Sequence, residues 1–363
     1  MNESLLPSPL DPSIDVPPSK ETRVERLFPF VRTVRDYQSK NFRPDFVAGL
    51  TTALFTIPQG MAYALIAGFP PAAGLATAVV ASILGAAFGS SEFLINGPTN
   101  ALAVMLAGNA ALFAAQGDAI EAVILLTLMI GIVQVAAGLA KLGSFTRFVS
   151  EPVLTGFTAG AGVYIVINQL PAFLGIDKSA IAPDLWGWVP QKCAAFDLMR
   201  LCRSLAHVKW PTITVALSTF VIVRGLQRLE PSIGRKLPAP FVAVLLVTVT
   251  TWALGMGVDG SPYRVKIVSD IEPLMRHLPG LRLPTFSVTS WRNLIGPAIA
   301  IGLMGAVEAI AIGKSLATRA GHPFDASRQL IGEGLCNLGA GFVGGFASSG
   351  SVSRTAVNHE AGA

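Results

Sequence analysis

Long apolar runs alternate with short polar segments from about residue 46 to the C-terminus. Each run is close to the roughly 20 residues that a helix needs to cross a bilayer. The pattern predicts spans at 46–66, 71–88, 97–115, 119–140, 148–170, 209–225 and 238–256. After a long polar segment it predicts further spans at 293–317 and 324–346, and the start of a tenth at residue 350.

The first predicted span returns in weakened form as the eighth. A shift of 253 residues places Gly49-Leu50 on Gly302-Leu303 and Gly97 on Gly350. Seven spans separate the starts of the two copies, and seven is odd, so the copies enter the membrane from opposite sides. An inverted repeat in an apolar chain predicts a secondary transporter that works by alternating access. Its substrate site is expected where the two copies of the broken helix meet, and Pro58 is expected to kink the first copy.

Composition indicates one membrane-embedded unit and not several soluble domains. Only 13% of its residues are charged, 52% are hydrophobic, and the mean hydropathy is +0.57. Soluble domains carry about 25% charged residues. The net charge of +5 resides in loops between spans, so it indicates orientation in the membrane and not affinity for nucleic acid. The sequence shows no nucleophile–base set and no metal-binding spacing, so it predicts neither an enzyme nor a cofactor.

The loop charges predict the topology. Basic residues cluster just before the first span and in the loops after the fourth, sixth and eighth spans, which places the N-terminus in the cytoplasm. The predicted units are a cytoplasmic tail at 1–45, a first repeat at 46–256, an extracytoplasmic loop at 257–292 and the start of a second repeat at 293–363. The basic loop residues are Lys141, Arg147, Arg224, Arg228, Arg235, Lys236, Lys314 and Arg319.

Two helix starts carry the candidate binding chemistry. The segment 96–100, Asn-Gly-Pro-Thr-Asn, opens the third span, and its repeat counterpart at 349–354, Ser-Gly-Ser-Val-Ser-Arg, opens the tenth. Two half-helix N-termini that face one another near the midplane would direct free N–H groups and positive dipole ends at one point, which favours an anion. The alternative is two ordinary helix starts with Ser/Thr caps.

Three polar residues stand out within apolar spans. Arg354 matches Ala101 in the other copy, and it calls for a bound anion or for a permanent partner such as Glu308 or Glu333. Glu308 is the only charged residue between Arg292 and Lys314. It is a candidate proton carrier, or else a hydrogen-bonded structural group. Gln59 supplies a binding group, or else a hydrogen bond between helices.

These residues resemble those of the sulfate permease (SulP) family of anion transporters. The resemblance covers about residues 40–363. It rests on the sequences at 46–50 (Phe-Val-Ala-Gly-Leu), 57–63 (Ile-Pro-Gln-Gly-Met-Ala-Tyr) and 96–99, and on 349–358 (Ser-Gly-Ser-Val-Ser-Arg-Thr-Ala-Val-Asn).

The resemblance implies an all-α polytopic membrane protein with a seven-plus-seven inverted-repeat fold like that of uracil permease. About ten of the fourteen spans are present, and the sequence stops before spans eleven to fourteen and the STAS domain. By motif position, the implied anion site comprises Gln59, Tyr63, Thr99, Ser351, Val352, Ser353 and Arg354. Glu308 takes the acidic position of span eight. Four residues after Glu308 stands Ile312, where sodium-coupled bicarbonate members of the family carry Thr. This difference argues against sodium and for protons as the coupling ion.

The sequence therefore predicts a transporter of a small inorganic anion in the bacterial inner membrane, with sulfate carried by proton symport. An exchanger of bicarbonate or dicarboxylate, an uncoupled channel and a non-transporting remnant are the alternatives. A complete protein could form a homodimer. A disulfide between Cys193 and Cys202 is left open by the sequence.

Overall fold

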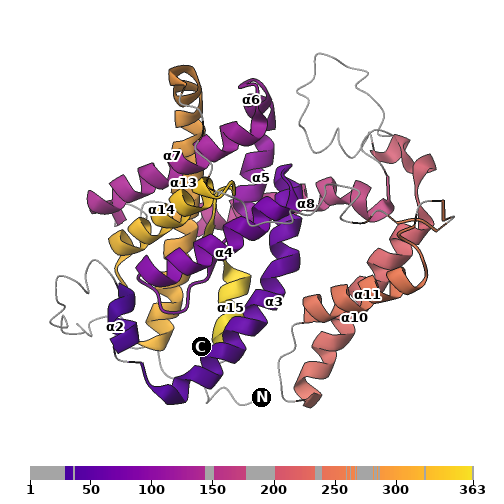
Figure 1. Ribbon diagram of the computed structural model, residues 1–363, viewed down its shortest axis with the longest axis horizontal. Helices are drawn as coiled ribbons and strands as arrows, with labels where there is room; N and C mark the ends of the chain where they lie inside the picture. Colours follow the sequence, from indigo (N-terminus) through magenta and orange to yellow (C-terminus); the bar gives the residue numbers. More distant parts are fainter. Residues whose placement is uncertain are drawn as a thin grey trace.

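The protein is described by a computed structural model (Figure 1). It describes residues 29–35, 37–143, 151–176, 201–233, 239–258, 260–261, 263–265, 267, 281, 284 and 287–361 without 323. Most of the predicted cytoplasmic tail lies outside these ranges, as do Arg147, Cys193, Arg235 and Lys236. Cys202 is a free, exposed thiol and Cys336 a free, buried one.

Within these ranges the chain forms helices and one short pair of strands. The helices up to residue 253 are α2 (Pro29–Arg35), η2 (Ser39–Asn41), α3 (Phe42–Ala67), α4 (Pro71–Phe88), α5 (Asn100–Gly108), α6 (Ala110–Ala114), α7 (Ala119–Leu139), α8 (Glu151–Leu174), η5 (Leu205–His207), α10 (Trp210–Ile233) and α11 (Ala239–Ala253). The later helices are α13 (Val288–Ala320), α14 (Ala326–Phe342) and α15 (Val352–Glu360), and the strands are β1 (Asn96–Gly97) and β2 (Ser349–Gly350).

Several of these helices can cross a bilayer. In the described part of the chain, five segments are long and apolar enough by length and composition: Ser39–Ala67, Pro71–Phe88, Ala119–Leu139, Trp210–Leu229 and Val288–Thr318. They correspond to α3 with η2, α4, α7, most of α10 and most of α13. The segments agree with the predicted first, second, fourth, sixth and eighth spans.

The repeat is visible in how its helices end. Helix α3 stops at Gly68, which has a φ of 85°, and α13 stops at Gly321, which has a φ of 69°. These glycines occupy equivalent positions in the two copies. A left-handed residue after the last helical turn lets backbone N–H groups return to the last carbonyls, and glycine adopts that conformation without a steric penalty.

Helices α7 and α14 cross at the centre of the protein through facing glycines. A Cβ atom on Gly131 would lie 2.7 Å from the carbonyl oxygen of Gly334, and one on Gly334 would lie 2.7 Å from that of Gly131. Helix α4 packs on α14, and α13 packs on both α7 and α14. Figure 1 shows α10 and α11 to one side of this body, with α15 beside α3.

Two helices differ from their predicted continuity. Helix α3 runs through Pro58 without interruption, so the first copy is not broken there, and the non-helical backbone lies in the connections at 89–99 and 343–351. The kink expected at Pro58 stays a prediction. The third predicted span at 97–115 is split into α5 and α6. The break falls at Asn109, whose amide Nδ2 donates to the carbonyl oxygen of Met105 at 2.8 Å. That bond competes with the regular helical ladder.

Candidate functional site

The two non-helical crossings meet through their backbones. Strands β1 and β2 are antiparallel, with Asn96 opposite Gly350 and Gly97 opposite Ser349. The N–H of Ser351 extends the contact by donating to the carbonyl oxygen of Ile95 at 3.0 Å. The shift of 253 residues exchanges these two residue pairs, as expected if an inverted-repeat axis passes between them. The predicted meeting of the two half-helix starts is therefore confirmed.

Each half-helix begins at a hydroxyl cap. Thr99 accepts from the N–H of Leu102 at 3.5 Å, and Ser351 accepts from the N–H of Arg354 at 3.4 Å. Both following helices have nine residues. The two starts are therefore Ser/Thr-capped, as the alternative interpretation predicts. They also face one another. The first turn of each helix still contains N–H groups that have no partner within the helix.

Arg354 is the buried cation of this junction. Its side chain has 0% exposure, and Nη2 donates to the carbonyl oxygen of Pro98 at 2.9 Å. Nε and Nη1 are buried and have no hydrogen-bond partner. Neither Glu308 nor Glu333 lies within the 4.0 Å of an ion pair with it, so a permanent Arg–Glu pair is not formed. Glu308 acts on the guanidinium only through a longer-range electrostatic interaction.

Two sets of polar contacts join other predicted residues. The Nε2 of Gln59 donates to the Oγ of Ser353 at 3.1 Å, and that Oγ lies 3.3 Å from the Oγ of Ser351. Gln59 thus makes a hydrogen bond between helices, which was one of the two interpretations of this residue. Its Oε1 is buried and has no partner. Thr99 donates to the Oε2 of Glu308 at 3.4 Å. The contacts bring α3, α5, α13 and α15 to one place.

Tyr63 and Val352 occupy different surroundings. Tyr63 is half-buried, packs against the main apolar core and interacts electrostatically with Arg354 and Glu308. Val352 is 62% exposed at the first position of α15. The structure therefore gathers the predicted site residues around Arg354, except that the side chain of Val352 lies on the surface.

Helix α14 carries a buried polar stripe that the sequence motifs do not predict. Gln329, Glu333 and Asn337 are spaced by four residues, so they lie on one face of the helix, and all three are buried. Gln329 accepts from the backbone of Ser90, Glu333 from the side chain of Asn96, and Asn337 from the backbone of Ser348. The stripe thus holds both non-helical crossings. Its signal in the sequence was three polar residues at helical spacing among small and apolar ones.

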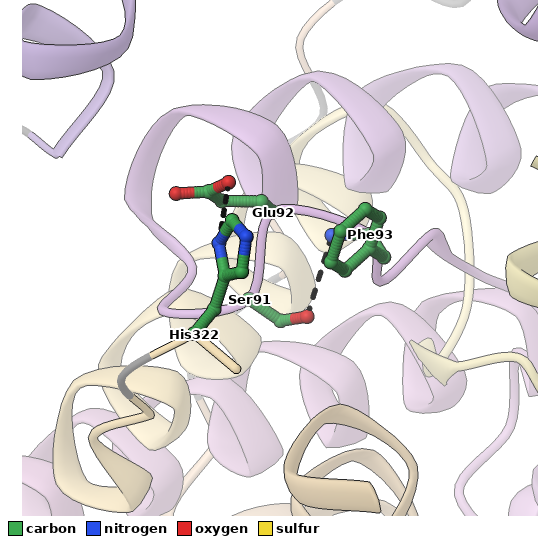
Figure 2. A network of polar contacts seen from close by, with 4 residues as sticks. All are labelled: Ser91, Glu92, Phe93 and His322. Atoms are coloured by element: carbon green, nitrogen blue, oxygen red, sulfur yellow. Dashed lines mark hydrogen bonds and ion pairs between the residues drawn. The ribbon is translucent and has the colours of Figure 1, made fainter. Parts of the chain in front are cut away.

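The two copies also meet in the loops that carry Glu92 and His322. The Nδ1 of His322 lies 2.9 Å from the Oε2 of Glu92, and the ring of Phe93 packs edge-on against the imidazole at a centroid distance of 5.6 Å (Figure 2). Phe93 makes a similar contact with His359, at 5.1 Å. Among the residues that the structure describes, no group of His, Cys, Asp and Glu side chains could hold a metal ion.

Comparison with known proteins decides the family. A family model described as the sulfate permease family matches residues 42–363. The chain belongs to the sulfate permease family. A probable sulfate transporter of Mycobacterium tuberculosis (strain CDC 1551 / Oshkosh) is 34% identical to this sulfate permease chain over 332 residues, which is 91% of the chain and 55% of the relative. The chain thus spans about half the length of that relative.

Solved structures place the same sulfate permease chain in a known transporter fold. The murine anion transporter Slc26a9 in the inward-facing state is 21% identical, with a TM-score of 0.82 over 95% of this chain and 57% of that one. The transmembrane domain of the cyanobacterial bicarbonate transporter BicA is 25% identical, with a TM-score of 0.72 over 90% and 78%. The fold is the all-α, seven-plus-seven inverted repeat that the sequence predicted.

Proposed function

We propose that this chain contains the anion-binding part of a secondary active transporter that carries sulfate with protons across the bacterial inner membrane, with its N-terminus in the cytoplasm. The observation that supports this most directly is Arg354. A fully buried guanidinium with two unpartnered nitrogens and no ion pair retains donors and a charge for a ligand. An arginine at membrane depth costs at least about 2.5 kcal/mol, and a bound anion would offset that cost.

The surroundings of Arg354 suit a small oxyanion. Thr99, Ser351 and Ser353 carry hydroxyl groups at the two half-helix starts. Hydroxyl groups can donate to oxyanion oxygens, as can the first-turn N–H groups of α5 and α15. Gln59 joins this set through Ser353. Nothing in this donor set selects one oxyanion by its shape alone, so the choice of sulfate is supported by the relatives that are named as sulfate transporters.

Glu308 is the group that we propose to carry the coupling proton. It accepts a hydrogen bond from Thr99, so a change in its charge reaches the proposed anion site through one side chain. Moving an anion inward against a negative interior costs about 2.3 kcal/mol per charge per 100 mV. Protons that enter with a divalent anion remove that cost.

Sulfate binding to the full chain purified in lipid tests the anion site. Calorimetry should show binding that Arg354→Ala abolishes. Arg292→Ala is the matched control, because it removes the same side chain from an exposed position on α13. Equal sulfate affinity in the wild type and Arg354→Ala would refute the assignment, provided that both proteins remain folded.

Bicarbonate is the second candidate substrate. The structural likeness to the bicarbonate transporter BicA favours it, and a hydroxyl-lined site would accept either anion. Competition decides between them. If bicarbonate displaces labelled sulfate at lower concentration than unlabelled sulfate does, bicarbonate is the preferred ligand.

A further inference from the structure

Glu333 is a buried carboxyl group that the proposed transport mechanism does not use. It lies in the middle of α14 with 0% exposure. Its Oε1 accepts two hydrogen bonds, from the Nδ2 of Asn96 at 2.8 Å and from the Nε2 of Gln329 at 2.9 Å. Its Oε2 is buried and has no partner. A carboxylate normally has acceptor sites on both oxygens satisfied when it is buried.

The side chain of Asn96 also has an oxygen without a hydrogen-bond partner. Its Nδ2 donates to Glu333, and it also approaches the Sγ of Cys336 at 3.2 Å. The Oδ1 of the same amide is buried without a donor. Two adjoining planar groups, already joined by one hydrogen bond, therefore each present one unpaired oxygen. Two bare acceptors cannot satisfy one another, but a single proton between them would.

Among the described residues, the carboxyl group of Glu333 also lacks a cation that would stabilise its charged form. Glu333 forms no ion pair with any Lys, Arg or His of the described chain. Helix α4 and both strands contain no titratable side chain, and α7 contributes only Glu121 in its first turn. Helix α13 carries its cations Arg292, Lys314 and Arg319 toward its two ends, and it brings Glu308 into electrostatic interaction with Glu333. An unpaired carboxylate in such a place is costly to bury.

We propose that Glu333 is a neutral carboxylic acid whose Oε2–H donates to the Oδ1 of Asn96, so that the two side chains form a two-bond acid–amide pair. Proton addition at Oε2 leaves Oε1 as the acceptor for Asn96 and Gln329 and satisfies both unpaired oxygens. Glu333 is thereby a positioning residue, because Asn96 belongs to β1 and lies three residues before Thr99, the cap of α5.

Space for the pair is built into α4. A Cβ atom on Gly85 would lie 2.9 Å from the Cγ of Asn96, so the absence of a side chain there lets the amide reach α14. The Oγ of Ser82, one turn away on α4, donates to the backbone carbonyl of Asn96 at 2.9 Å. Asn96 is thus held on both its backbone and its side chain, and the pair with Glu333 fixes the second of these.

Infrared spectroscopy tests the protonation without reference to any ligand. In the full chain purified in lipid at neutral pH, difference spectra between wild type and Glu333→Gln should reveal the C=O stretch of a protonated carboxylic acid. The same component should survive in Glu308→Gln and shift in Asn96→Leu, which removes its hydrogen-bond partner. A wild type without this component, or its persistence in Glu333→Gln, would overturn the proposal.

Sulfate affinity tests the positioning role, which rests on the proposed function. Glu333→Leu should lower the affinity about tenfold, the size expected for a lost hydrogen bond that left a buried group unpaired. The conservative Glu333→Gln should restore it to within about twofold, because its amide can donate to Asn96 as the neutral acid does. Equal losses in both variants would refute the positioning role. If the wild type binds no sulfate, the proposed function fails, and the infrared result still decides the acid–amide pair.

Discussion

The guanidinium of Arg354 bonds the carbonyl oxygen of Pro98 at 2.9 Å, so the second copy of the repeat reaches into the half-helix start of the first. The equivalent residue in the first copy is Ala101, which returns no such contact. The pair is thus an asymmetric element in an otherwise symmetric junction. It holds the cation in place through one nitrogen and leaves two nitrogens unpaired.

Gly97 provides the space in which this arginine lies. A Cβ atom on Gly97 would lie 2.9 Å from the Nη1 of Arg354 and 3.1 Å from its Cζ, and the φ of 155° is one that other residues rarely adopt. Gly97→Ala should therefore displace the guanidinium and lower the sulfate affinity at least about tenfold. Calorimetry measures the change. Gly108→Ala, at a position with open space around it, should bind as the wild type does, and equal binding by both variants would contradict the geometry.

Proton coupling through Glu308 predicts a defined pH response. In proteoliposomes of the complete transporter that contains this chain, at fixed membrane potential, sulfate uptake should fall as the external pH is raised, because fewer protons are available to enter with the anion. Glu308→Gln should flatten this profile, since its amide cannot take up or release a proton. Glu92→Gln removes a carboxylate from an exposed loop and should keep the wild-type slope. An unaltered profile in Glu308→Gln would exclude Glu308 as the proton carrier.

The crossing of α7 and α14 should not tolerate a methyl group. Gly131→Ala brings its Cβ to 2.7 Å from the backbone of Gly334, so the helices must separate. Overpacking of this kind costs about 1–3 kcal/mol, and the midpoint of thermal unfolding should fall. Gly296→Ala, on α13 with nothing within 4 Å of the added atom, should leave the midpoint unchanged or raise it, since alanine favours helix over glycine. A midpoint for Gly131→Ala that matched this control would show that the helices are not packed so closely.

The contact between His322 and Glu92 should contribute little to stability. The two side chains are 40% and 60% exposed, and exposed ion pairs contribute about 1 kcal/mol or less. Glu92→Gln should therefore change the free energy of unfolding by less than about 1 kcal/mol, and added salt should shrink the difference further. Chemical denaturation measures both. A larger, salt-independent loss would mean that this loop contact stabilises the junction of the two copies.

The repeat made much of the fold predictable, because residues at equivalent positions of the two copies have the same structural role. Gly68 and Gly321 both end a long helix in the left-handed conformation, and the segments at Gly97 and Gly350 form the facing starts. The break at Asn109 was not predictable from the apolar pattern. It depends on one side chain that bonds the backbone four residues earlier, and such bonds leave hydropathy unchanged.

The residues of the candidate site can be named from the sequence, but their contacts cannot. Arg354 and Glu308 were both singled out as charges without counterparts in the other copy, yet whether they pair depends on distances between α13 and α15. The role of Glu333 was less accessible still. In the sequence it was only one possible partner for Arg354, whereas in the structure it faces Asn96, a residue 237 positions away.

The pairing of β1 with β2 also constrains how this protein can change. Side chains alternate along a strand, so a slip of one residue turns every side chain to the opposite face. An insertion or deletion in one crossing would therefore rotate its half-helix start away from the other. The lengths of the two crossings, which lie 253 residues apart in the sequence, therefore depend on one another. A change in the length of one crossing would preserve the facing helix starts only with a matching change in the other.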